Sequence, residues 1–158
     1  SIVEKKSGDL ALNNSGYGSQ AVATPSTWYT WNDGGIEFAV ARLMIGKTPE
    51  SIIGMIQMQG HASTATNQGL ITNNTPLGKI KSITLSLGDS SSESYQYTPA
   101  FTVYGGTEAN ALTTAITESG NKFNPTFDFS GGNFSHFTIK NDKTGALYIS
   151  KITVVYEK

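Results

Sequence analysis

The stretch Ile80-Lys81-Ser82-Ile83-Thr84-Leu85-Ser86-Leu87 returns, in pattern, as Ile149-Ser150-Lys151-Ile152-Thr153-Val154-Val155-Tyr156. Both stretches read Ile-x-x-Ile-Thr-aliphatic, and both carry a lysine and a serine between the isoleucines. After the second isoleucine, apolar residues recur at every other position, which is the pattern of a β-strand with one buried face. The repeated pattern predicts two strands in equivalent structural roles.

The isoleucines of each stretch lie three positions apart, so a regular strand would put them on opposite faces of the sheet. A β-bulge between them would turn both side chains toward the core. Without a bulge, the first isoleucine must be buried elsewhere.

Short runs rich in β-branched and aromatic residues occur along the rest of the chain, separated by clusters of Gly, Asn, Asp and Ser. The predicted strands are residues 2–4, 27–31, 36–45, 52–59, 79–87, 100–104, 126–129, 134–140 and 147–156. Hairpin turns are predicted at residues 32–35, 130–133 and 141–145, and a long polar connection at residues 60–78. Residues 109–116 fit either a helical turn or an edge strand.

No segment keeps a helical period over three turns, so the pattern predicts an all-β chain of antiparallel sheets, as a sandwich or a barrel. No linker or break in composition interrupts the pattern. Residues 1–158 are therefore predicted to form a single domain, long enough to bury roughly 70% of its unfolded surface without disulfides or metals.

The composition is poor in charge. Only 15% of the residues are charged, against about 25% in typical domains, and Ser, Thr, Asn and Gly fill the polar positions. A net charge of −1 and a single arginine, Arg42, argue against nucleic acid and anionic bilayers as partners. No apolar run reaches the ~18 residues of a membrane helix, so membrane insertion is not expected. Cysteine is absent, which is neutral with respect to the redox compartment.

The order of several strands resembles a family of β-sandwich modules found in secreted and cell-surface proteins of gut and soil bacteria and in their phages. The stretches that carry the resemblance are Ile56-Gln57-Met58-Gln59, Leu77-Gly78-Lys79-Ile80-Lys81-Ser82-Ile83-Thr84, Phe101-Thr102-Val103-Tyr104-Gly105-Gly106-Thr107, Phe137-Thr138-Ile139-Lys140-Asn141 and residues 146–156. The pattern, over about residues 52–156, is similar to the galactose-binding-like jelly rolls used as carbohydrate-binding modules. The resemblance implies an antiparallel β-sandwich of jelly-roll type and a non-catalytic role in adhesion or glycan binding, but it carries over no binding residue.

Aromatic side chains are the first candidates for ligand contact, because their flat apolar faces stack on sugar rings. Trp28, Tyr29 and Trp31 form one group, and Tyr95 and Tyr97 form a second group on one strand face beside a serine-rich loop. The alternative for both groups is packing, with the rings filling the sandwich or covering its rim.

Two glutamines, Gln57 and Gln59, are also candidates, since their amides both donate and accept hydrogen bonds. The alternative is that they face water. These seven residues make up the predicted ligand-binding set, and no catalytic or metal-binding residue is predicted.

The sequence gives little support for a catalytic or metal-binding site. The only histidines, His61 and His136, lack the spacing of a zinc site, and His136 is expected to point outward from its strand. A thiol nucleophile is excluded, and the chain has no Gly-x-Ser-x-Gly motif. Asp89 and Glu93 fit a calcium-binding loop or, more simply, a solvated turn. No cofactor is expected.

The sequence therefore predicts a non-enzymatic recognition module that binds a glycan or surface polymer outside the cell or at the cell surface. The alternative is a structural subunit of a phage virion, a capsid decoration or fibre component, whose faces contact neighbouring protein subunits.

Overall fold

The computed structural model describes residues 2–5, 29–33, 35–45, 56–65, 68–87, 101–121 and 124–157. Within these ranges the chain forms thirteen β-strands in two antiparallel sheets, and no helix. The prediction of an all-β, antiparallel chain is confirmed. Among the same residues there is consequently no helix that would be able to cross a bilayer.

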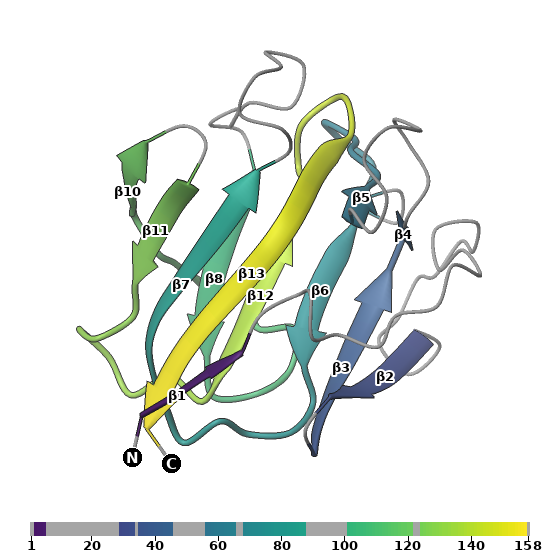
Figure 1. The fold of residues 1–158 in the computed structure, drawn as a ribbon. Helices are drawn as coiled ribbons and strands as arrows, with labels where there is room; N and C mark the ends of the chain where they lie inside the picture. Colours follow the sequence, from purple (N-terminus) through teal and green to yellow (C-terminus); the bar gives the residue numbers. More distant parts are fainter. Residues whose placement is uncertain are drawn as a thin grey trace.

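Sheet A has seven strands. Its order is β10 (Glu118–Asn121), β11 (Asn124–Asp128), β7 (Lys79–Leu87), β13 (Leu147–Glu157), β5 (Ile56–Met58) and β4 (Leu43–Ile45), with β1 (Ile2–Lys5) also paired to β13. Ile2 lies opposite Glu157, so the first and last described strands run side by side (Figure 1).

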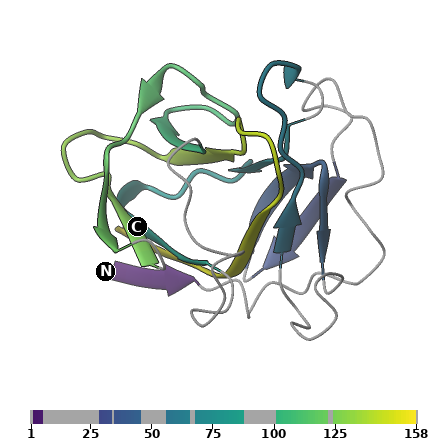
Figure 2. The ribbon, with the colours of Figure 1, turned by 90° about the horizontal axis from the view of Figure 1, so that it is seen from above.

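Sheet B has six strands. Its order is β2 (Tyr29–Asp33), β3 (Ile36–Ala41), β6 (Leu70–Asn73), β12 (His136–Lys140), β8 (Thr102–Gly106) and β9 (Thr114–Ala115). Figure 2 shows the two sheets facing each other across the interior, an arrangement consistent with a β-sandwich.

A single large cluster of buried apolar side chains fills the space between the sheets, with members from both. Phe101 and Phe127 meet across it edge to face, with ring centroids 6.0 Å apart. Burying each such side chain stabilises the fold by roughly 1.5–3 kcal/mol, so this cluster is the main source of stability.

The two repeated stretches are the neighbouring central strands β7 and β13 of sheet A. Their register shifts by one residue twice, once between Ile149 and Lys151 and once between Val155 and Tyr156, where Ile80 is the next partner. Each irregularity falls between the two isoleucines of one strand. All four isoleucines are buried as a result, so of the two alternatives left open by the sequence, an irregularity between the isoleucines is the one found.

The same register makes the strands equivalent. Ile80 lies opposite Tyr156, and Ile149 lies opposite Leu87, so the pairing is symmetric about the Thr84–Thr153 pair. The prediction of equivalent structural roles is therefore confirmed.

The predicted loop at residues 60–78 is wrong, because it contains β6, whose four residues are all buried. Two of them are polar, and long-range hydrogen bonds satisfy them. The Thr72 hydroxyl donates to the Phe137 carbonyl (2.8 Å), and Asn73 accepts from the Phe137 N–H (2.8 Å) and donates to the Ser135 carbonyl (3.0 Å).

Three further predictions concern turns. The hairpin at residues 32–35 is confirmed by the β2–β3 pairing. The hairpins at residues 130–133 and 141–145 are wrong, because each segment passes from one sheet to the other.

The predicted strand at residues 36–45 is divided by Arg42, whose φ of 55° turns the chain from sheet B into sheet A. Of the two alternatives for residues 109–116, the edge strand is found, as β9.

Candidate functional site

For most of the predicted ligand-binding residues the structure does not describe the side chain. Trp28, Tyr95 and Tyr97 are outside the described residues. For three others, Tyr29 and Trp31 in β2 and Gln57 in β5, only the backbone is described. Gln59 is exposed just beyond the end of β5. A ligand-binding role for these seven residues stays a prediction.

The described residues contain no group of three or more His, Cys, Asp or Glu side chains placed to hold a metal ion. Asp89 and Glu93 lie outside them. His61 has a local structural role, since its Nδ1 accepts hydrogen bonds from the N–H groups of Ser63 (3.1 Å) and Thr64 (2.8 Å).

The expectation that His136 points to solvent is wrong, because its side chain is only 5% exposed. Its Nε2 lies 3.4 Å from the carbonyl of Asn74 and its Nδ1 lies 2.8 Å from the hydroxyl of Ser135. With the proton on Nε2, the ring donates to Asn74 and the Ser135 hydroxyl donates to Nδ1. Burial lowers the pKa of His136, although the Asn74 carbonyl and the Glu108 carboxylate oppose this shift.

A pocket of about 410 Å³ lies where the loop after β8 meets the loop before β12. We call it the Phe134 pocket. Its lining residues are Gly105, Gly106, Thr107, Glu108, Ala111, Thr113, Thr114, Asn133 and Phe134. Three threonine hydroxyls, one amide and one carboxylate come from exposed side chains, so the rim offers both donors and acceptors of hydrogen bonds.

Phe134 is partly buried, and its ring lies between two glycines. A Cβ added to Gly105 would lie 2.8 Å from the ring, and one added to Gly132 would lie 2.5 Å from it. The ring also meets Phe129 edge to face, with centroids 5.7 Å apart. The two glycines are thus required for the ring to reach its position.

Backbone hydrogen bonds hold this segment to both sheets. The Phe134 carbonyl accepts from the N–H of Ile80 in β7 (2.8 Å), and the Ser135 N–H donates to the carbonyl of Gly106 in β8 (3.1 Å). The pocket is therefore built on the scaffold rather than on a loop held only at its ends.

The other wall is the loop at residues 107–113, which folds back over sheet B. Asn110 has a φ of 57°, and its N–H donates to the hydroxyl of Thr72 in β6 (2.9 Å). Ala111 lies against Gly106, where a β-carbon would collide with it. These contacts place Glu108 close enough to His136 for its charge to raise the histidine pKa.

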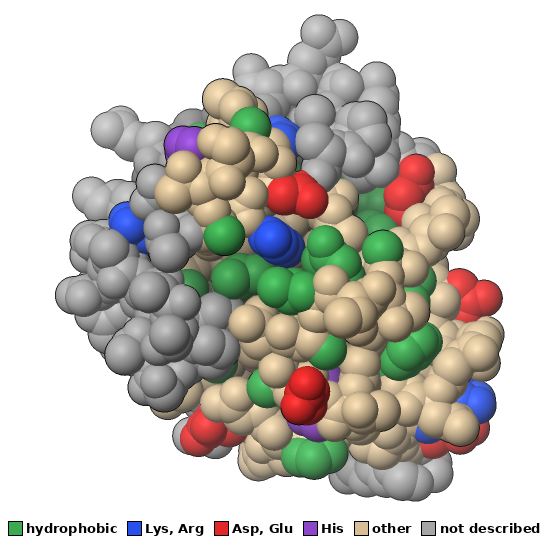
Figure 3. Space-filling view, turned by 180° about the vertical axis from the view of Figure 1, so that it is seen from behind, with side chains coloured by type: hydrophobic (Ala, Val, Ile, Leu, Met, Phe, Trp, Pro, Cys, Tyr) green, Lys and Arg blue, Asp and Glu red, His purple; other side chains and the backbone are tan. Residues whose placement is uncertain are grey.

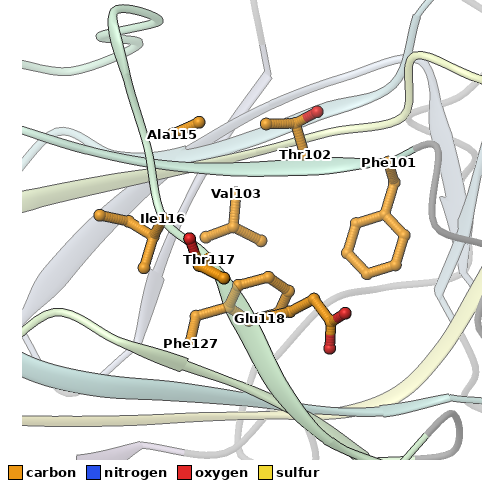
Figure 4. Close-up of a pocket in the computed structure, with 8 residues that line it drawn as sticks. All are labelled: Phe101, Thr102, Val103, Ala115, Ile116, Thr117, Glu118 and Phe127. Carbon is orange, nitrogen blue, oxygen red and sulfur yellow. The ribbon is translucent and has the colours of Figure 1, made fainter.

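A second pocket, about 370 Å³, opens at the edge of the sandwich beside the crossing from β9 to β10. We call it the Phe127 groove. Figure 4 shows Phe101, Val103 and Phe127 converging in it, with Thr117 from the crossing segment and Glu118 from the start of β10 beside them. The two rings and the valine are at most 5% exposed, so this groove is a gap at the margin of the core.

The Phe134 pocket was missed in the sequence because its parts look like ordinary turns. The sequence predicts only turns at Gly105-Gly106 and Gly131-Gly132. A usable signal was present in Gly-Gly-Asn-Phe, residues 131–134, where a phenylalanine follows glycines inside a loop.

Comparison with protein-family models gives no match, and comparison with curated proteins gives no significant one. Inference about function therefore rests on the pocket and on the surface around it. The face in Figure 3 carries separate charged groups among many uncharged side chains in the described part of the molecule.

Proposed function

We propose that this protein is a non-catalytic recognition module that binds a glycan or surface polymer, and that the Phe134 pocket contacts the saccharide. The observation that carries the proposal is a partly exposed phenyl ring, fixed between two glycines, beneath a rim of hydroxyl, amide and carboxylate groups. A sugar ring presents C–H groups on one face and hydroxyls around its edge, so it needs these two kinds of contact together.

The size of the pocket supports a small ligand or one unit of a polymer, since small-molecule sites typically measure about 300–1,000 Å³. Its rigidity supports binding as well. A ring and a rim held in place by the two sheets lose little conformational freedom when a ligand enters.

A non-catalytic role is favoured by the acids and bases near the pocket. Glycoside hydrolysis uses two carboxyl groups about 5–10 Å apart, whereas Glu108 is the single carboxylate in the lining of this pocket. His136 is buried and already hydrogen-bonded to Ser135 and Asn74, which leaves it poorly placed to take a proton from a substrate.

We also propose that the sandwich is a jelly roll. From β5 to β8, successive strands alternate between the two sheets, and β12 and β13 do so again. The final strand lies inside its sheet and not at its edge. This arrangement supports the resemblance to accessory modules of bacterial secreted and cell-surface proteins, and with it a location outside the cell.

The proposal is tested by titrating the isotopically labelled protein with glucose, galactose, N-acetylglucosamine and a soluble mannan, and following the backbone amide signals. At least one of these probes should shift the signals of residues 105–114 and 131–135 in a saturable manner. Phe134→Ala should abolish the shifts. Gly131→Ala is the matched control, because a Cβ at Gly131 meets nothing within 4 Å.

The aromatic residues predicted from the sequence provide a second set of variants for the same binding experiment. If Trp28→Ala, Trp31→Ala, Tyr95→Ala or Tyr97→Ala abolishes binding while Phe134→Ala does not, the module binds its ligand at those residues and the assignment of the pocket is wrong. Indifference to all four probes, together with concentration-dependent assembly in sedimentation, would instead favour the virion subunit.

A further inference from the structure

The lining of the Phe134 pocket carries negative charge and no positive charge. Among its nine lining residues, Glu108 is the only ionisable side chain, and no lysine or arginine takes part. Glu108 is exposed, and its side chain ends in a carboxylate. A ligand that enters the pocket therefore meets a negative potential with no compensating cation in the lining.

The buried histidine beneath the loop does not cancel this charge. Burial favours the neutral form of His136, so the histidine does little to offset this charge at neutral pH. The contacts of Asn110 with Thr72 and of Ala111 with Gly106 keep the 107–113 loop, and with it Glu108, at the pocket.

We infer that the Phe134 pocket selects saccharides without negative charge and prefers those that carry an ammonium group. The inference rests on the proposed function and deepens it by naming the ligand class. The sugar ring packs on Phe134, the hydroxyls of Thr107, Thr113 and Thr114 and the amide of Asn133 bind its hydroxyl edge, and Glu108 pairs with the ammonium. A uronic acid makes the same apolar contact but places its carboxylate in the field of Glu108.

Four monosaccharides of similar shape separate these contributions: glucosamine, N-acetylglucosamine, glucose and glucuronate, each titrated at slightly acidic pH, where the glucosamine amine is protonated. Glucosamine should bind more tightly than glucose by up to about fivefold, the range of an exposed ion pair. Glucuronate should bind most weakly. Added salt should narrow the differences, because it screens exposed charges.

Glu108→Gln keeps the shape of the side chain and removes its charge. In this variant glucosamine should bind no better than glucose, and glucuronate should gain affinity. Glu118→Gln is the matched control, since it removes one carboxylate from the Phe127 groove and should leave the order of affinities unchanged.

The two proposals fail in different ways. Equal binding of glucuronate and glucosamine, or an order of affinities that survives Glu108→Gln, overturns the charge selection while glucose binding upholds the recognition module. Absence of binding by all four sugars overturns both.

Discussion

The Phe134 pocket and the Phe127 groove both contain phenylalanine, threonine and one glutamate, and they differ in how deeply the phenylalanine rings are buried. Phe127 is 2% exposed and Phe101 is 5% exposed, so in the groove the rings belong to the core. Phe134 packs against the core but remains partly exposed. A buried ring contributes its area to stability, and an exposed part of a ring is available to a ligand.

The largest effect should come from truncating the two rings in turn. Phe127→Ala removes a core side chain that joins the two sheets, so the free energy of unfolding should fall by about 3–5 kcal/mol. Phe134→Ala should cost clearly less, because part of that ring is already in water, yet it should abolish saccharide binding. Urea unfolding of both variants measures the difference. Equal losses of stability would mean that Phe134 is a core residue and would remove the distinction between the two regions.

A smaller effect is expected at the two adjacent glycines before Phe134. Gly132→Ala places a Cβ 2.5 Å from the phenyl ring, so the ring must move, at a cost of about 1–3 kcal/mol. The proton NMR signals of the Phe134 ring should shift, and the affinity for saccharides should fall. Gly131→Ala, with no atom within 4 Å, should change stability by less than about 0.5 kcal/mol. Were the two variants indistinguishable, the ring would not be held by Gly132.

The success of the sequence prediction was greatest where one face of a strand carries all of its apolar residues. In β7, β8 and β13 the alternation is regular enough to predict the strands, and the spacing of Ile80 and Ile83 limits their burial to two alternatives, of which a bulge is the one found. β6 is different. Its two buried polar residues, Thr72 and Asn73, form hydrogen bonds with Phe137 in β12 and with Ser135 just before it, more than sixty positions away along the chain. No local pattern contains that information.

The candidate site escaped prediction for the same reason. Gly106 lies opposite His136 because β8 pairs with β12, and this pairing brings the end of β8 and the loop that follows it next to the glycine-containing loop of Phe134. From the sequence, each loop is merely a turn. The aromatic residues predicted instead, such as Trp28 and Tyr95, stand out by side-chain type and local spacing, and neither property tells which strands pair.

The smallest predicted effect concerns His136, which lies beneath the Phe134 pocket. The lining of the Phe127 groove contains no histidine. The pKa of His136 is lowered in the folded protein, so the unfolded chain takes up a proton first as pH falls. Above the unfolded pKa of about 6.5, His136 is neutral in both states and contributes no pH dependence. Below it, stability should decline until pH passes the lower pKa of the folded state.

The slope should stay well below the one-proton limit of about 1.4 kcal/mol per pH unit, because the Asn74 carbonyl and Glu108 favour the protonated ring and partly offset its burial. Protonation also makes Nδ1 a donor, so the Ser135 hydroxyl must turn from donating to accepting. Urea unfolding between pH 7 and pH 5 measures the slope, which His136→Gln should reduce. Because Glu108 faces both His136 and the ligand, a charged His136 should also weaken the preference for glucosamine over glucose. If the preference for glucosamine over glucose stayed constant while the free energy of unfolding fell, the charge on His136 would have no influence on ligand binding in the pocket.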